Sequence, residues 1–141
     1  MPPRRVPYAK LKELLLEEIR RQKKSFGLII ADISGGQTNT TTYDFQAFKG
    51  MPRIVYKVDA VTGKETLVRG VEFVGTPIGS LNRILATSDK EGVFNGFCGA
   101  ESGYVPVSTV APAVLMTEIE LQRAERALER KAVLPAPWEQ P

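Results

Sequence analysis

"RIVYKVDAVTGKETLVRGVEFV", residues 53–74, carries the strongest secondary-structure signal in the chain. Its first run alternates apolar side chains at Ile54, Tyr56 and Val58, and a second strand-like run follows a Thr-Gly-Lys sequence at 62–64. Alternation with a period of two predicts strands with one buried face, and two such runs around a short glycine-bearing turn predict an antiparallel hairpin. We therefore expect this hairpin to form part of the central sheet.

The sequence before the hairpin predicts a helix, a short strand and a loop. Pro7 suits the first turn of a helix over 8–24, "YAKLKELLLEEIRRQKK". The apolar side chains of this segment recur at helical spacing and predict a packed face: Leu11, Leu14, Leu15 and Ile19. The run "LIIADI" (28–33) predicts a short buried strand. The segment 34–52 is rich in Gly, Thr, Asn and Ser and predicts a long loop.

The sequence after the hairpin predicts a second, short helix within 75–92, with Thr76 as its N-cap and Pro77 at its first position. Its apolar residues keep helical spacing: Ile78, Leu81, Ile84 and Leu85. The segment 112–123 alternates apolar residues and predicts a terminal strand.

These elements predict an α+β fold with a mixed or mostly antiparallel sheet of about five strands, an N-terminal helix and one short internal helix. The length of 141 residues suits a single domain, 1–141, and we expect 1–7 and 132–141 to be extended tails. A hydrophobic content of 43% and a charged content of 25% are typical of a globular chain, so a packed core is expected.

Composition also narrows the location and the partners. A single cysteine excludes an internal disulfide framework and suits a reducing compartment, so we expect a cytoplasmic protein. The sequence has no apolar run of about 20 residues, and no membrane segment is expected. The net charge is +3, but the basic residues gather at 4–5 and 20–24. Basic clusters at helix ends complement the helix dipole, and no basic stripe with interleaved aromatics is present, so nucleic acid is not the expected partner.

The absence of histidine limits the chemistry of the chain. Papain-like and serine-triad sites both need a histidine base, and the glycines at 92, 96, 99 and 103 match no phosphate-binding motif. The segment "VFNGFCGAESGYVPVS" (93–108) holds the only cysteine, Cys98. Two interpretations remain open. Cys98 is one ligand of a metal site, in which the nearby glycines would let a metal approach closely, or it is a small buried apolar residue.

The stretch "VFNGFCGAESGYVPVSTVAPAVLMTEIELQR" (93–123) resembles the C-terminal part of the TldD/PmbA family. These are the TldD-type zinc metallopeptidases, also described as modulators of DNA gyrase. Three further stretches resemble the same family in the same order: "GLIIADISGGQTNT" (27–40), "VRGVEFVGTP" (68–77) and "AVLPAP" (132–137). The resemblance runs from about Tyr8 to Pro137, and its most specific part is "GFCG" followed closely by "VPV".

In this family a helix with the motif H-E-x-x-x-H supplies two histidine ligands and a glutamate general base, and a cysteine of the C-terminal domain supplies the third ligand. The resemblance implies that Cys98 is this zinc ligand. It implies that further residues of the segment line part of a site for unfolded peptides: Gly96, Phe97, Gly99, Tyr104 and Val105. It also implies a homo- or hetero-dimer.

The family holds its peptides in an extended form, which suggests strand addition to an exposed sheet edge. The edge expected to serve lies around Tyr104–Ser108 or in the Thr-rich loop. The alternative for "YVPVS" (104–108) is an ordinary edge strand in which Pro106 blocks further pairing.

The chain departs from the family pattern because it has no histidine and therefore no H-E-x-x-x-H motif. The chain resembles the last third of such a protein. Three explanations are open: it is a fragment, a split-gene product or a relic. We expect it to be inactive alone, to hold no cofactor alone, and to bind zinc only with a histidine-bearing N-terminal region or partner subunit. The alternative function is a non-catalytic subunit-assembly domain that uses its strand edges and basic N-terminal helix.

Overall fold

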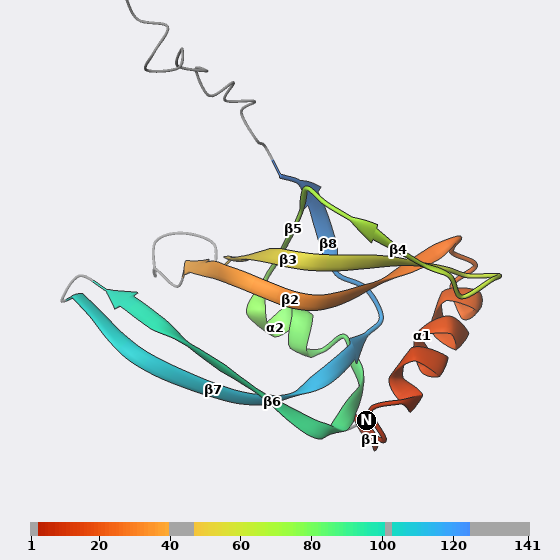
Figure 1. Ribbon diagram of the computed structural model, residues 1–141, viewed down its shortest axis with the longest axis horizontal. Coiled ribbons are helices and arrows are strands. Elements are labelled where there is room, and N and C mark those ends of the chain that lie inside the picture. Colours follow the sequence, from red (N-terminus) through yellow and green to blue (C-terminus); the bar gives the residue numbers. More distant parts are fainter. Residues whose placement is uncertain (1–2, 40–46, 101–102, 125–141) are drawn as a thin grey trace, which may run out of the picture.

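The computed structural model describes residues 3–39, 47–100 and 103–124, which form two sheets and two helices (Figure 1). Along the chain the elements are β1 (Arg4–Val6), α1 (Lys10–Arg21), β2 (Phe26–Asn39), β3 (Ala47–Asp59), β4 (Glu65–Val68), β5 (Val71–Gly75), α2 (Pro77–Leu81), β6 (Ile84–Ala100), β7 (Gly103–Met116) and β8 (Glu120–Arg123). The predicted α+β class, with an N-terminal helix, a short internal helix and mostly antiparallel pairing, is confirmed.

Strand β3 organises the larger sheet. It pairs antiparallel with β2 from Asn39↔Ala47 to Phe26↔Asp59, and its other edge pairs with β4 over 55–58 and with β5 over 48–50. Strand β8 completes this sheet by pairing with β5. The predicted hairpin is thus confirmed as β3–β4, and β5 returns to the same edge of β3 further along.

Local hydrogen bonds fix the β3–β4 turn. The Asp59 carboxylate accepts bonds from the backbone N–H groups of Thr62 (2.7 Å) and Val61 (3.0 Å) and from the Thr62 hydroxyl (2.8 Å). The bonds from Thr62 and then from Val61 lower the pKa of Asp59. Gly63 has a φ of 67°, in the left-handed region that glycine adopts without a steric penalty. The turn is therefore fixed by its own sequence.

The smaller sheet has the order β1-β6-β7. Strands β6 and β7 form a long antiparallel hairpin, and β1 pairs in parallel with the start of β6, from Arg4↔Ala86 to Val6↔Ser88. The prediction of an extended tail over 1–7 is therefore wrong at residues 4–6. The physical reason is burial: Val6 is only 4% exposed and packs with Ala86 and Leu115.

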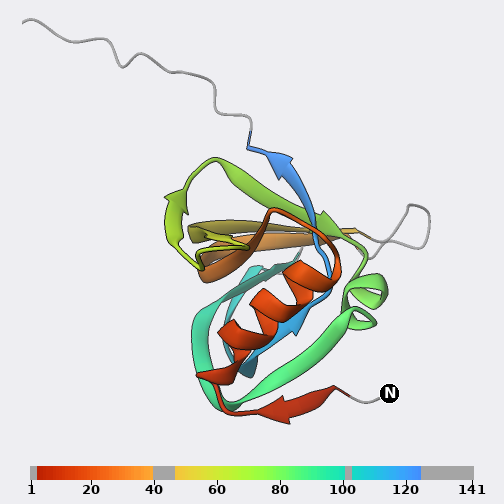
Figure 2. The same ribbon diagram turned by 90° about the vertical axis from the view of Figure 1, so that its right-hand side faces the viewer.

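Helix α1 joins the two sheets (Figures 1 and 2). Its predicted apolar stripe faces inward, with Leu11, Leu14 and Leu15 packed against the core of the smaller sheet. Its last buried residue, Ile19, reaches the larger sheet at Gly27, where an added Cβ would lie 2.6 Å from the Ile19 Cδ1 atom. The glycine at this position of β2 therefore lets the helix approach the strand closely.

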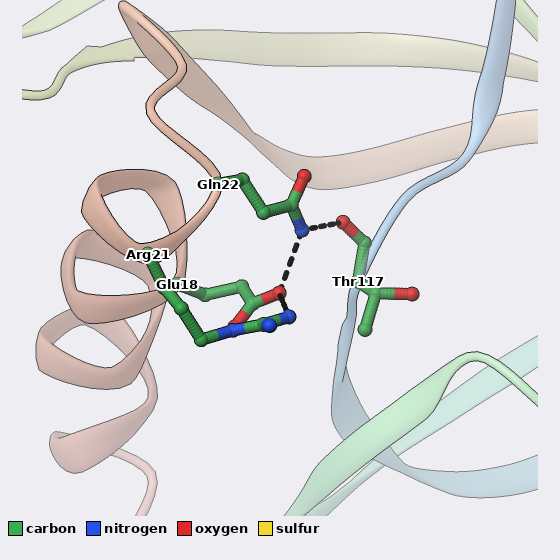
Figure 3. A network of polar contacts seen from close by, with 4 residues as sticks. All are labelled: Glu18, Arg21, Gln22 and Thr117. Carbon is green, nitrogen blue, oxygen red and sulfur yellow. Dashed lines mark hydrogen bonds and ion pairs between the residues drawn. The ribbon is translucent and has the colours of Figure 1, made fainter.

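A polar network ties the end of α1 to the segment between the sheets (Figure 3). The Glu18 carboxylate is 8% exposed and accepts two bonds from the Arg21 guanidinium, at 2.6 and 2.7 Å. The Gln22 amide donates both to Glu18 (2.6 Å) and to the carbonyl of Thr117 (2.8 Å). Thr117 lies between β7 and β8, where the chain passes from one sheet to the other.

The prediction of a long loop over 34–52 is wrong at both ends of this segment. Residues 34–39 continue β2 and residues 47–52 begin β3, and the two segments pair with each other. The segment between them lies outside the described residues. Gly, Thr and Asn form strands here because a partner strand satisfies their backbone groups, and such tertiary pairing overrides weak strand propensity. Register shifts between Ile30 and Gly35 bend the ladder.

Two further predictions are corrected downstream. Helix α2 ends at Leu81. Ile84 and Leu85 were expected in this helix but belong to β6, because the pairing of β6 with β7 overrides their helical spacing. The predicted terminal strand over 112–123 divides into β7 and β8, which lie in different sheets. The structure has eight strands among its described residues, against about five expected. The tail predicted over 132–141 lies outside those residues.

Replacing Gly50 with alanine should destabilise the protein, because the added Cβ would overlap the ring of Phe73, which is 8% exposed and packs edge-on against Phe48. We expect the free energy of unfolding to fall by about 1–3 kcal/mol in urea titrations. Gly92→Ala is the matched control, since its nearest neighbour would be the Ala111 carbonyl at 3.9 Å. Equal losses for the two variants would contradict this account of the sheet packing.

The Glu18 network should make the stability depend on pH. The bond from Arg21, together with the bond from Gln22, holds the pKa of Glu18 below its ordinary value in the folded state, although burial opposes the shift. The network's contribution is therefore complete above the ordinary carboxyl pKa and is lost as the pH falls through the lowered folded pKa. In Glu18→Gln, we expect the free energy of unfolding to fall less steeply between neutral and acidic pH than in the unmodified protein. Parallel pH curves would show that the network does not act this way.

Candidate functional site

The predicted site residues lie together in the outer part of the β6–β7 hairpin. We call residues 91–100 of β6 and 103–112 of β7 the distal ribbon. Its register consists of opposed pairs that include Gly96↔Val107, Phe97↔Pro106, Cys98↔Val105 and Gly99↔Tyr104. The residues predicted for the metal and peptide sites therefore occupy consecutive cross-strand pairs. Figure 1 shows this ribbon extending away from α1.

The pleat of the strands gives the distal ribbon two faces, because opposed side chains share a face and successive side chains alternate. The face that carries the cysteine, which we call the thiol face, contains Phe94, Cys98, Val105, Val107 and Thr109. The opposite face, which we call the reverse face, contains Glu91, Val93, Asn95, Phe97, Tyr104, Pro106, Ser108, Val110 and Pro112. The predicted residues thus divide between two faces, with Cys98 and Val105 on one and Phe97 and Tyr104 on the other.

Two glycines of β6 accommodate aromatic rings. An added Cβ at Gly96 would lie 2.8 Å from the Phe94 ring, and one at Gly99 would lie 2.7 Å from the Tyr104 ring. Each ring therefore lies across bare backbone on its own face of the ribbon, as aromatic residues do beside strand glycines. The close approach that the sequence predicts for a metal or substrate at these glycines is made here by the chain's own side chains.

The thiol of Cys98 is exposed, so the interpretation of Cys98 as a buried core residue is wrong. Its strand lies in a two-stranded ribbon that pairs, within the part of the chain that the structure describes, with β7 alone around Cys98, and this position could not be inferred from composition. Among the described residues, no three His, Cys, Asp or Glu side chains gather where they could hold one metal ion. A catalytic zinc needs three protein ligands. The described residues therefore do not form such a site by themselves, and Cys98 can supply one ligand at most.

The two edges of the distal ribbon differ in their capacity to add a strand. Strand β7 carries Pro106 and Pro112, which are an even number of residues apart and so direct their missing N–H groups to the same side. Because proline cannot donate to a ladder, that side is the outer edge of β7. Strand β6 has no proline, and the pairing that the described residues make at its outer edge is with β1, at 86–88. Beyond that point β6 presents the more open edge.

A hydrogen bond that the sequence did not predict joins Asn95 and Ser108. The Ser108 hydroxyl donates to the Asn95 side-chain carbonyl at 2.8 Å across the reverse face. This pair lies between the apolar pairs Val93↔Val110 and Phe97↔Pro106. The period-two alternation of residues 93–99 indicates on which face Asn95 lies. The register of the partner strand was needed to place Ser108 opposite it.

Two other sets of charged side chains form polar contacts in the larger sheet. The Glu72 carboxylate pairs with Lys49 at 2.7 Å and accepts a bond from Gln122 at 2.9 Å. These bonds, with that from Lys49 the largest, lower the pKa of Glu72. Asp32 pairs with Arg53 across β2 and β3. These pairs link neighbouring strands of the larger sheet.

A hollow of about 210 Å³ lies beside α1, and its lining includes Leu14, Glu18, Arg21, Ala86 and Leu115. It is smaller than the roughly 300–1,000 Å³ of sites that bind drug-sized ligands. It lies at the root of β6, about 40 Å along the strand from Cys98 at ~3.3 Å per residue. The hollow and the thiol are therefore separate features.

The described part of the chain contains no helix long and apolar enough to cross a membrane. In comparisons with known proteins, no family model matches the chain and no curated protein matches its sequence.

The exposure of Cys98 predicts rapid labelling of the native protein by a thiol reagent such as Ellman's reagent. We expect one thiol to react at a rate within about tenfold of that in the unfolded chain, whereas a thiol reached only through unfolding would be slower by roughly a thousandfold or more. The measurement is the absorbance time course with and without denaturant. Labelling that requires denaturant would place Cys98 in a closed environment.

Proposed function

We propose that the chain is the C-terminal domain of a TldD-type zinc metallopeptidase that cleaves unfolded peptides in the cytoplasm. In this proposal Cys98 supplies one zinc ligand, and a histidine-bearing N-terminal region or partner subunit supplies the H-E-x-x-x-H motif. The observation that carries the proposal is the exposed thiol on the projecting distal ribbon. A ligand that completes a site made by another segment must be reachable by that segment, and Cys98 meets this requirement.

The surroundings of Cys98 support the proposal. Its immediate neighbours on the thiol face are Gly96, across which the half-exposed Phe94 ring lies, and Val105, which is 60% exposed. A helix that brings two histidines can therefore approach the thiol without first displacing a packed layer. Zinc held in this way would polarise the scissile carbonyl and lower the pKa of its bound water. The contribution of this chain is to supply the thiolate and hold it on a regular ladder.

The positions of the prolines favour β6 as the strand that receives an extended peptide. The outer edge of β7 around Tyr104–Ser108 contains Pro106, which interrupts a ladder, whereas β6 between 91 and 99 has no proline. A peptide added at the outer edge of β6 would lie beside the strand that carries Cys98. Backbone pairing of this kind binds many sequences, since it reads no side chain directly. This suits a peptidase that acts on unfolded chains.

A non-catalytic assembly domain is the second candidate, and a different observation favours it. In the described residues 18 large hydrophobic side chains are exposed, whereas 8 hydrophobic side chains are buried. Seven of the exposed ones lie close together on the distal ribbon, and contiguous exposed apolar surface usually marks an interaction site. This excess of exposed over buried hydrophobic side chains suits a chain that completes its structure by joining another segment, with or without a metal. Both candidates require assembly, and they differ in whether Cys98 binds zinc.

Elemental analysis for zinc distinguishes the two candidates. The chain is purified alone and after co-expression with an upstream coding region or neighbouring gene product that carries H-E-x-x-x-H. The metallopeptidase proposal expects near-stoichiometric zinc only in the co-purified complex, and loss of that zinc in Cys98→Ser. Val105→Ser is the matched control, since it alters the residue opposite Cys98 without removing a thiolate. A complex that contains no zinc, or that keeps its zinc in Cys98→Ser, would support the assembly domain instead.

A further inference from the structure

The hollow beside α1 is a feature that the proposed zinc chemistry does not use. Its apolar lining comes from three elements, with Leu14 on α1, Leu85 and Ala86 on β6, and Leu115 on β7. Leu85 is the extra residue of a bulge, because β7 passes directly from the partner of Ile84 to the partner of Ala86. A bulge redirects a side chain. Leu85 and Ala86 therefore line the same hollow, although neighbours on a regular strand point to opposite faces.

Four charged side chains complete the lining, and two of them are paired with each other. Glu18 accepts two bonds from Arg21 and a third from Gln22 (Figure 3). The other two are Arg4 of β1 and Glu17 of α1, and both are exposed. The ion pairs formed within the described residues involve neither Arg4 nor Glu17. The rim of the hollow therefore offers one cation and one anion that no described side chain neutralises.

Strand β1 places Arg4 beside the core. Arg4 and Val6 are two residues apart and so share a face of the strand, and Val6 is buried in the core under α1. Arg5 points to the other side, where its guanidinium donates to a backbone carbonyl of β6 at 3.4 Å. An arginine in such a place packs its aliphatic stem on apolar surface and keeps its head in water. The guanidinium of Arg4 is thus available at the rim, and its planar fork suits a carboxylate.

We propose that the hollow binds a free α-amino acid with an aliphatic side chain, such as leucine. Its side chain would lie on the apolar lining, its carboxylate would pair with Arg4, and its ammonium would pair with Glu17. The volume of about 210 Å³ suits a molecule of this size better than a drug-sized ligand. A fatty acid or an aliphatic amine would leave one of the two rim charges without a partner. Charge complementarity therefore selects a zwitterion, and the lining selects its side chain.

The test is a titration of the full 141-residue chain with L-leucine, followed by the NMR shifts of its backbone amides. We expect saturable shifts at residues of the hollow such as Ala86 and Leu115, and none at Cys98. The expected Kd is on the order of 1–10 mM, because exposed ion pairs contribute little. Three analogues test the groups of the ligand: 4-methylpentanoate lacks the ammonium, 3-methylbutylamine lacks the carboxylate, and N-acetyl-leucine amide lacks both charges. Each should bind more weakly than leucine, by about two- to fivefold for each charge removed.

Variants of the two rim residues test the protein side of the contact. Arg4→Gln and Glu17→Gln should each weaken leucine binding by about two- to fivefold, since each removes one exposed ion pair. Arg5→Gln is the matched control for the first, because Arg5 lies on the other face of β1. Glu13→Gln, one helical turn earlier and paired with Lys10, is the control for the second. Both controls should bind leucine as the unmodified chain does, and the amide spectrum of each variant checks its fold.

Three results would overturn the proposal. The first is the absence of saturable shifts up to about 50 mM leucine, well above the expected Kd. The second is equal weakening by Arg4→Gln and Arg5→Gln, which would show a general effect of charge. The third is binding of N-acetyl-leucine amide as tight as that of leucine, which would show that the hollow receives a side chain of a polypeptide instead of a free amino acid.

The inference goes beyond the proposed function and does not depend on it, because the hollow lies far from Cys98 and the titration uses the chain without zinc. Zinc content is measured separately, in the co-purified complex with a histidine-bearing segment. Leucine binding together with a zinc-free complex would keep the amino acid site and end the metallopeptidase proposal. A zinc-bearing complex whose chain does not bind leucine would do the reverse.

Discussion

The packing of α1 between the two sheets is the interaction on which the rest of the structure depends. Its apolar stripe meets Val6, Ala86 and Leu115 of the smaller sheet, and its Ile19 reaches β2 at Gly27. The Glu18 network adds a polar link from the same helix to the segment between the sheets. Without this helix the two long hairpins would have little buried surface in common. A small, well-placed core thus supports much longer strands.

The small size of the core also explains the shape of the candidate site. Only the root of the β6–β7 hairpin is buried, at residues such as Ala86 and Leu115, and its outer part extends beyond the core as a two-stranded ribbon. A ribbon of this kind has two faces, and among the described residues both carry exposed apolar side chains beside a few polar ones. The exposed thiol on one of these faces is the feature on which the proposed metal site rests.

Local sequence was a good guide where local interactions decide the structure. The β3–β4 hairpin was predictable because its turn is held by Asp59, Thr62 and Gly63, which are neighbours in the chain. The apolar stripe of α1 was predictable for the same reason. The segment 34–39 was not, because its polar residues form a strand only by pairing with β3. Ile84 and Leu85 have helical spacing, yet the pairing of β6 with β7 makes them a strand.

The same distinction between local sequence and tertiary contacts applies to the candidate site. The sequence by itself determined the residue types: one cysteine among glycines and aromatics, a chain without histidine, and a resemblance to the C-terminal part of the TldD/PmbA family. Only the tertiary structure decided that Cys98 is exposed, that Phe97 and Tyr104 lie on the face opposite to it, and that Asn95 bonds to Ser108. The reason is that exposure and cross-strand register depend on which other segments lie nearby. Those segments are far away in the sequence, and local patterns do not encode their positions.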